Sequence, residues 1–322
     1  YQRNSLVLFG HHCDDQNETV AMRLCRQSGL RGLEGIAPLR FYKGALFARP
    51  FLSYPKAELT HLCTLFGVNF ISDPSNTNGM FERVRWRRLL ETDSELPRQL
   101  GQLSRVANTL STQLDGQIMA WINAHVSLVA RLRASCPHLV FSTQPEAHRH
   151  HILAALLAIC GHSSFPPSMD AIAELDKRLA SGHAATLASC KVRYEKQWLV
   201  VEAEFGRKSV NEVPIVPGRI GFFDGRWMVW AGCAGKVRRL GSIPLSDKDI
   251  KQIPLPEELF CLPKKLQDMI PILQTLDDRL LPPHFRTDSL LTGKSGFRFR
   301  DGFADRHSFI IWPAPIERPV RL

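Results

Sequence analysis

The sequence lacks paired cysteines. Its 8 cysteines are scattered singly and no C-x-x-C pair occurs, so we expect neither a structural zinc site nor a disulfide framework. Single inert thiols in a reducing cytoplasm are the expectation that remains. The sequence also lacks any apolar run near the roughly 20 residues that span a bilayer. We therefore expect a cytoplasmic protein without a membrane partner.

Basic residues outnumber acidic ones, with a net charge of +10, and the excess lies in residues 1–92 and 206–322 while 93–205 are neutral. This distribution suits a polyanionic partner held at two points, although it also serves solubility alone. A chain of 322 residues allows two or three domains. Composition predicts an α/β domain over 1–92, a mainly helical domain over 93–205, and a basic, Pro- and Gly-rich α+β region over 206–322.

The local patterns also predict individual elements. A helix is expected to start near Pro55 and end at Gly67, because its apolar positions are spaced for one helix face. Short strands are expected in the first 92 residues at 45–47, 51–52 and 68–71, and further along the chain at 185–187, 191–194 and 198–202.

Residues 11–19 form the densest polar segment of the chain. They follow a short apolar strand at 6–9 and open an amphipathic helix. In an open α/β sheet a strand end and a helix N-terminus face one crevice, where ligands collect. Asp15 and Glu18 project from one face of this helix, and such a pair can hold an ammonium group, bind Mg²⁺ through water, or remove a proton. Capping of the helix N-terminus is the alternative role for Asp14.

Arginines gather at positions 83, 85, 87 and 88, shortly after the turn at 73–76. Guanidinium groups suit phosphate oxygens because they bind them bidentately without losing charge. A solvated basic face is the alternative. The adjacent His11 and His12, with the aspartates that follow, also fit a metal-dependent phosphoesterase, but neighbouring histidines point in different directions and rarely ligate one ion together.

Read together, these segments resemble the tRNA(Ile)-lysidine synthase family. The resemblance rests on collinear motifs: His11-His12-x-Asp14-Asp15-Gln16-x-Glu18-Thr19, Arg23-x-x-Arg26-x-Ser28-Gly29-Leu30-x-Gly32-Leu33-x-Gly35-Ile36, Arg49-Pro50-Phe51-Leu52, Asp73-Pro74-Ser75-Asn76, and Phe81-x-Arg83 with Arg87. It implies an N-type ATP-pyrophosphatase (adenine nucleotide α-hydrolase-like) parallel-sheet domain that uses ATP and Mg²⁺. It also implies a two-step ligation. C2 of the wobble cytidine in isoleucine tRNA with a CAU anticodon is adenylated, and free lysine then displaces AMP to give lysidine.

The resemblance also implies the site residues. Asp15, Glu18, Arg83 and Arg87 are expected to be catalytic. Lysine must be held as a cation and attack as a neutral amine, which carboxylates assist, and arginines stabilise phosphate charge as AMP is transferred and displaced. Substrate or nucleotide binding is expected of His11, His12, Asp14, Gln16, Arg23, Ser28, Gly29, Arg49, Asp73 and Asn76.

Two features depart from the family pattern. The pyrophosphate loop, Ser-Gly-Gly-x-Asp-Ser, does not occur in the chain, so we expect it upstream of Tyr1 and expect a truncated domain that does not hydrolyse ATP alone. Val84 stands where the family usually has Asn. Two alternatives therefore stay open: a catalytically inactive tRNA-binding fragment, and another tRNA-modifying ATP-pyrophosphatase of the class that thiolates tRNA. The sequence leaves the oligomeric state undetermined, and a homodimer stays open.

Overall fold

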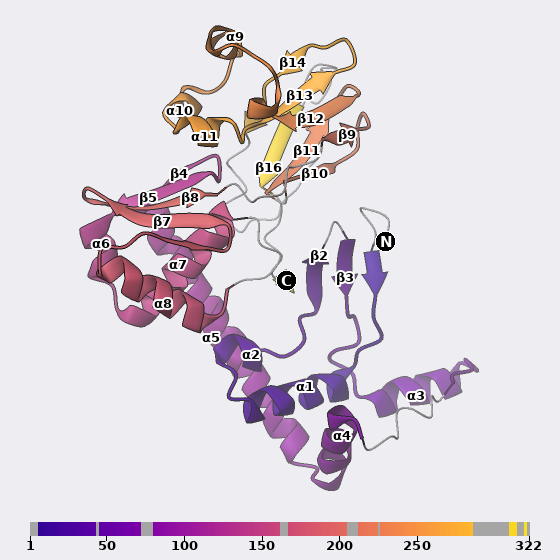
Figure 1. Ribbon diagram of the computed structural model, residues 1–322. Coiled ribbons are helices and arrows are strands. Elements are labelled where there is room, and N and C mark those ends of the chain that lie inside the picture. The colour runs from indigo at the N-terminus through magenta and orange to yellow at the C-terminus, as the bar shows by residue number, and fades with distance from the viewer. Residues whose placement is uncertain are drawn as a thin grey trace. The chain divides into compact units, whose positions relative to one another are not determined.

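The computed structural model describes residues 6–42, 45–71, 80–161, 167–204, 212–224, 226–285, 309–313 and 319–320. The chain divides into two compact units, Tyr1–Gln117 with Glu317–Leu322 and Ile118–Ile316, whose elements are labelled in Figure 1. This division falls within the long helix α5 (Leu96–His125), whereas the boundaries near 92 and 205 stay a prediction from composition. None of the helices in these ranges is both long and apolar enough to cross a membrane.

A four-stranded sheet in the first unit has the order β1-β3-β2-β17. β1 (Leu6–Leu8) runs parallel to β3 (Ala45–Ala48), whereas β2 (Leu39–Tyr42) is antiparallel to β3 and to β17 (Pro319–Val320). Parallel neighbours need a helical crossover, and α1 (Cys13–Cys25) supplies it directly after β1. The N-terminus of α1 therefore lies at the carboxyl end of the parallel pair, as the sequence predicts.

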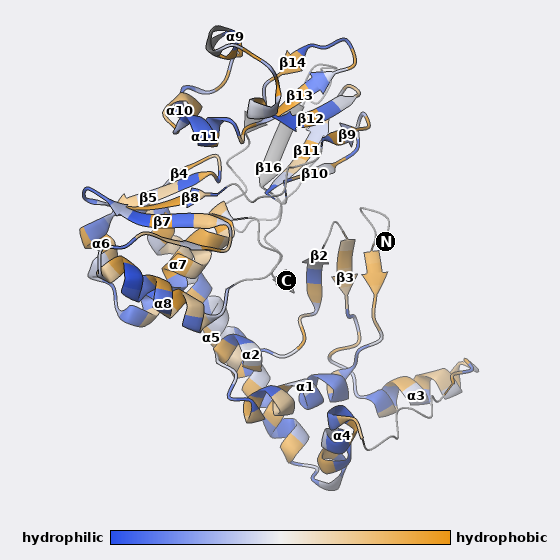
Figure 2. Ribbon diagram, viewed as in Figure 1, coloured by the Kyte–Doolittle hydropathy of each residue, from blue (hydrophilic) through white to orange (hydrophobic). Residues whose placement is uncertain are grey.

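The described part of the first unit holds four further helices: α2 (Leu30–Leu33), α3 (Lys56–Leu65), α4 (Glu82–Thr92) and the first part of α5. Their shared core is small. It holds Val20 and Ala21 of α1, Leu90 of α4 and Leu100 of α5. Figure 2 shows that the rest of α1 and α4 is largely hydrophilic. Polar contacts must therefore supply much of what joins these two helices.

The second unit begins with a five-stranded antiparallel sheet in the order β4-β5-β8-β7-β6. Helices α6 (His138–Ser142), α7 (Glu146–Cys160) and α8 (Met169–Ala180) lie along one face of it in Figure 1. Three of the strands occupy the predicted positions. The five strands are β4 (Ser127–Val129), β5 (Arg133–Pro137), β6 (Ala185–Leu187), β7 (Cys190–Glu195) and β8 (Trp198–Ala203).

The rest of the second unit contains two four-stranded sheets, ordered β14-β13-β12-β9 and β10-β11-β16-β15. Buried apolar side chains such as Trp227, Val237 and Leu266 form one core with residues of the preceding sheet. The strands are β9 (Val213–Ile215), β10 (Gly221–Phe223), β11 (Trp227–Ala231), β12 (Gly235–Arg239), β13 (Pro271–Thr275), β14 (Leu280–Leu281), β15 (His284–Phe285) and β16 (Phe309–Pro313). The short helices are η2 (Leu240–Ser242), α9 (Asp247–Gln252), α10 (Glu257–Phe260) and α11 (Lys264–Gln267).

Two buried arginines bind the C-terminal end of α7. Arg131 Nε donates to the carbonyl of Ile159 (2.8 Å), and Arg226 Nε donates to that of Cys160 (3.0 Å). The last carbonyls of a helix have no partner within it and carry partial negative charge. Burial lowers the pKa of Arg131 to about 10, so its guanidinium stays charged at neutral pH. The two arginines thereby join the turn after β4 and the hairpin before β11 to one helix end.

Candidate active site

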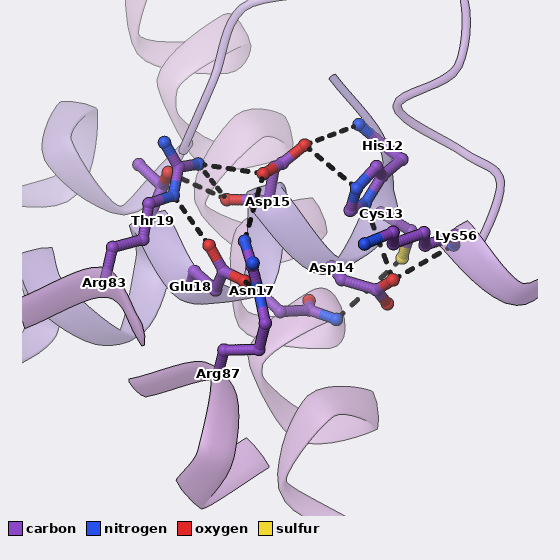
Figure 3. Close-up of polar contacts among 10 residues, drawn as sticks. All are labelled: His12, Cys13, Asp14, Asp15, Asn17, Glu18, Thr19, Lys56, Arg83 and Arg87. Carbon is purple, nitrogen blue, oxygen red and sulfur yellow. Dashed lines mark hydrogen bonds and ion pairs between the residues drawn. The ribbon is translucent and has the colours of Figure 1, made fainter. Parts of the chain in front are cut away.

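The N-terminus of α1 gathers His12, Asp14 and Asp15 (Figure 3). His12 is the N-cap residue, and its backbone N–H donates to Asp15 Oδ2 at 3.0 Å. Asp14 points the other way, and its Oδ2 accepts the backbone N–H of Lys56, the first residue of α3, at 3.0 Å. The carboxylate thus sits where the dipole of α3 favours negative charge. Asp14 therefore caps the neighbouring helix rather than its own.

Glu18 is held between two arginines from α4. Its side chain is 1% exposed. Oε2 accepts from Arg83 Nε and Oε1 from Arg87 Nε, each at 2.6 Å. Arg83 also pairs with Asp15 Oδ1 at 3.2 Å. Residues four apart share a helix face, so both guanidinium groups point at α1. The structure thus brings the four predicted catalytic residues into one cluster, which we call the carboxylate–arginine clamp (Asp15, Glu18, Arg83, Arg87).

The clamp has charge consequences. The hydrogen bond that Arg87 donates to Glu18 raises the pKa of Arg87 against the opposing effect of burial. Both Glu18 oxygens are occupied, so this carboxylate orients the arginines and is poorly placed to take a substrate proton. Asp14 is different, because its side chain is 45% exposed. Of Asp14, Asp15 and Glu18, it is the carboxylate that a ligand reaches most easily.

A pocket of about 220 Å³ opens beside the clamp, lined by His12, Asp14, Asn17, Glu18, Lys56, Arg87, Leu90, Glu91 and Pro97. The share of liquid volume of one water is about 30 Å³, so the pocket has room for a small metabolite. The lining carries three carboxylates and two cationic side chains, which leaves one net negative charge.

Asn17 lies on the wall of this pocket and was not singled out from the sequence. Only 5% of the residue is exposed, and its Oδ1 is buried without a hydrogen-bond partner. Its Nδ2 approaches Cys13 Sγ at 3.8 Å. Asn17 occupies an unspecified position of the motif, as does Cys13, so the pattern gave no signal for it. Lys56 and Glu91 were missed for another reason: each is an ordinary charged residue until the fold places it here.

Gln16 and Arg23 have structural contacts in this fold. Gln16 donates to the Glu34 carbonyl (3.1 Å) and accepts from the Ile36 N–H (2.6 Å). Arg23 donates to the carbonyls of Gly32 (2.9 Å) and Gly35 (2.8 Å). Gly35 has φ +79°, and a Cβ there would lie 2.6 Å from Gln16 Nε2. This close approach explains why position 35 is a glycine.

The remaining predicted binding residues are spread over the first unit. Ser28 and Gly29 follow the far end of α1, a helix of 13 residues, which places them roughly 20 Å from its N-terminus. Arg49 donates to the Ala37 carbonyl at 2.9 Å, and its guanidinium carbon lies 5.1 Å from the centre of the Phe9 ring. Asp73 and Asn76 lie outside the described residues.

His11 lies at the carboxyl end of β1. Burial lowers the pKa of His11, and the charges of Arg49 and Arg83 lower it further against the pull of Asp15. The imidazole is therefore mainly neutral at neutral pH. Among the described residues, no group of three or more His, Cys, Asp or Glu side chains is arranged to hold a metal ion.

Comparison with known proteins gives the class first. Residues 1–93 match the model of the PP-loop domain. The α/β sheet and helices of the first unit agree with this, and the predicted fold class, an α/β domain like those of N-type ATP-pyrophosphatases, is confirmed. The match agrees with the use of ATP that the motifs imply.

The particular resemblance is to curated proteins named tRNA(Ile)-lysidine synthase. The protein from Hyphomonas neptunium is 32% identical over 225 residues, which are 66% of this chain and 58% of the relative. That from Rhizobium meliloti is 30% identical over 233 residues, 69% of this chain and 50% of the relative. That from Ruegeria pomeroyi is 26% identical over 259 residues, 76% and 58% of the two chains. The chain spans about half the length of these relatives, and the resemblance predicted from the motifs is confirmed.

Proposed function

We propose that the protein acts in the ATP-dependent ligation of lysine to C2 of the wobble cytidine of CAU-anticodon isoleucine tRNA, through an adenylated tRNA. The observation that carries this proposal is the carboxylate–arginine clamp beside a pocket of matching charge, within a PP-loop domain. The names of the relatives support the choice of lysine and isoleucine tRNA.

The arginines of the clamp serve the nucleotide half of the reaction. A guanidinium has five N–H donors, and Glu18 occupies the Nε donor of each arginine. The side chains of Arg83 and Arg87 are 39% and 24% exposed, so their outer N–H groups can reach phosphate oxygens. Held in place, they stabilise negative charge that develops on the phosphate. ATP supplies the activated AMP group when it is bound.

Mg²⁺ fits this arrangement only through the nucleotide. The ion usually takes one or two carboxylates together with substrate phosphates and waters. Asp14 and Glu91 are the pocket-lining carboxylates that could supply such a ligand, and Glu18 is already fully engaged by arginines.

The pocket serves the lysine half of the reaction. Free lysine carries two ammonium groups and one carboxylate at neutral pH, so its net charge is opposite to that of the pocket lining. Asp14 is placed to hold an ammonium group and to take its proton before attack. Lys56 is the cation available for the lysine carboxylate.

Binding is the test for this chain, because the pyrophosphate-loop motif does not occur in it. Equilibrium dialysis with labelled lysine should show saturable binding that norleucine, which lacks the side-chain ammonium, does not compete. Asp14→Asn should weaken binding about tenfold or more, since a charge-assisted contact is lost. The matched control is Glu95→Gln, which removes an exposed carboxylate paired with Arg98. Equal lysine affinity in the wild type and Asp14→Asn would overturn the assignment of the pocket.

The RNA half has its own test. The chain should bind a tRNA(Ile) transcript with a CAU anticodon more tightly than the same transcript with uridine at the wobble position. A thiolating enzyme has no need of lysine, so RNA binding without any lysine binding would favour that alternative instead.

A further inference from the structure

Exposed aromatic side chains concentrate in one stretch of the described chain. Phe51, Tyr54, Phe66, Phe70 and Phe81 are exposed in the first unit, whereas Trp198 and Phe260 are their exposed counterparts among the described residues of the second. Single exposed apolar residues are ordinary. These five aromatic residues all lie between positions 51 and 81, the stretch that supplies α3 and the start of α4. They therefore form a cluster in the sequence and are not isolated exposed residues.

Two of these aromatic residues, Tyr54 and Phe81, are attached by backbone hydrogen bonds to the helices of the candidate site. The carbonyl of Tyr54 accepts the backbone N–H of Cys13 at 2.9 Å, which fixes the residue beside the N-terminus of α1. Phe81 is the N-cap residue of α4, and its carbonyl accepts the backbone N–H of Val84 at 3.0 Å. Both residues are about half exposed, at 49% and 57%. The backbone is anchored in each case while the side chain stays in solvent.

The charge around the second ring suits a polyanion. Arg85 and Arg88 are exposed on α4, and Arg85 donates to the carbonyl of Met80 at 3.0 Å, which holds the residue before Phe81 against the helix. Single-stranded RNA is bound by this combination, in which unpaired bases stack on aromatic rings and arginines follow the phosphates.

We propose that Tyr54 and Phe81 are stacking platforms for the unpaired bases next to the nucleotide that enters the site, with Arg85 and Arg88 contacting the phosphates. The proposal rests on the proposed function, in which the modified base belongs to a single-stranded RNA loop. It goes further by assigning residues that hold the loop open. A base that leaves its stack deprives its neighbours of a partner, and the two rings replace the lost stacking.

The test uses the full chain and an RNA stem–loop with a CAU loop, in which 2-aminopurine replaces the central adenine. Tyr54→Ala and Phe81→Ala should each weaken binding about 10-fold or more and should increase the 2-aminopurine fluorescence of the complex, because stacking quenches it. Tyr54→Phe and Phe81→Tyr should restore both signals. Phe260→Ala, which removes an exposed ring of the second unit, is the matched control and should change neither.

Salt dependence separates stacking from phosphate contacts. The Ala variants of Tyr54 and Phe81 should leave the slope of log affinity against log salt unchanged, whereas Arg88→Gln should reduce that slope by about 1. A fully paired RNA of the same length should bind the wild type and the aromatic variants equally, because it offers no unstacked base.

The outcomes distinguish the stacking proposal from the proposed function on which it rests. If the CAU stem–loop binds tightly and the aromatic variants match the wild type in affinity and fluorescence, the stacking proposal is wrong and the proposed function stands. If the wild type does not bind the loop at all, both are wrong. Circular dichroism and hydrogen exchange of α1 and α4 show whether each variant is folded.

Discussion

Replacing Glu18 with Gln is expected to destabilise the contact between α1 and α4 by about 3 kcal/mol. The side chain is 1% exposed and accepts two charge-assisted hydrogen bonds of 2.6 Å. Each such bond contributes about 1.5–3 kcal/mol. Gln keeps one acceptor and turns N–H groups toward the other arginine, so one bond survives weakened and the other is lost. Both arginines can turn partly to solvent, which offsets part of the destabilisation.

Hydrogen exchange measured by mass spectrometry is the suitable assay, because it reports on α1 and α4 separately from the second unit. A loss of about 3 kcal/mol corresponds to roughly 100-fold faster exchange of amides that exchange through opening of this contact. Glu95→Gln is the matched control. Its pair with Arg98 is equally short at 2.6 Å but has side chains that are 49% and 75% exposed. Exposed pairs contribute little, so exchange in the control should change by less than about 3-fold.

Equal protection of α1 and α4 in the wild type and Glu18→Gln would refute the reasoning. It would mean that the cost of removing the carboxylate from water cancels its hydrogen bonds, as occurs in some buried ion pairs. The double variant Glu18→Gln with Arg87→Gln isolates the coupling. If the clamp is stabilising, the double variant should lose less than the two single losses combined.

Three further predictions follow from burial and charge. Arg87→Gln should destabilise the first unit more than Arg83→Gln, because the Arg87 side chain is less exposed (24% against 39%). Hydrogen exchange of α1 should be faster in Arg87→Gln than in Arg83→Gln, and faster exchange in Arg83→Gln would contradict the prediction. Burial lowers the pKa of His11 from its ordinary 6.5, so the unfolded state binds more protons below that pH. Stability should thus be full above about pH 6.5 and fall as the pH drops through the folded pKa, and urea titrations of His11→Asn should lack this part of the fall. Burial raises the pKa of the Cys136 and Cys160 thiols to about 12. A thiol reagent at pH 8 should therefore label the native protein fastest at the exposed thiols, Cys25 and Cys261. Rapid labelling of Cys136 or Cys160 would be inconsistent with the fold.

Local pattern predicted many elements well, and it failed where a strand depends on its neighbours. The strands at 45–48, 185–187, 190–195 and 198–203 and helix α3 are confirmed. The strand predicted at 51–52 is wrong: these residues form a turn that follows Pro50, which has no N–H to donate. The strand predicted at 68–71 is also wrong. These residues pair with no strand of the described chain, and strand propensity alone does not supply a hydrogen-bonding neighbour.

The candidate site was foreseen as a set of residues but not as an arrangement. Helical spacing places Asp15 and Glu18 on one helix face and Arg83 and Arg87 on another. Spacing within a helix does not show that these two faces pack together, because Arg83 and Glu18 are 65 residues apart in the sequence. The binding roles predicted for Gln16 and Arg23 stay predictions. Their motif suggested ligand binding, whereas their side chains contact the backbone at 32–36. Motif membership does not distinguish a residue that touches a ligand from one that shapes the loop beside it.

Val84 is the position where the sequence departs from the pattern of the family that it resembles. Val84 is 7% exposed and lies in α4 directly after Arg83. Both arginines reach Glu18 through their own Nε atoms, so the clamp does not depend on the side chain between them. An amide at this buried position would need hydrogen-bond partners to offset its loss of water, whereas valine needs none. Valine at this position therefore leaves the clamp intact.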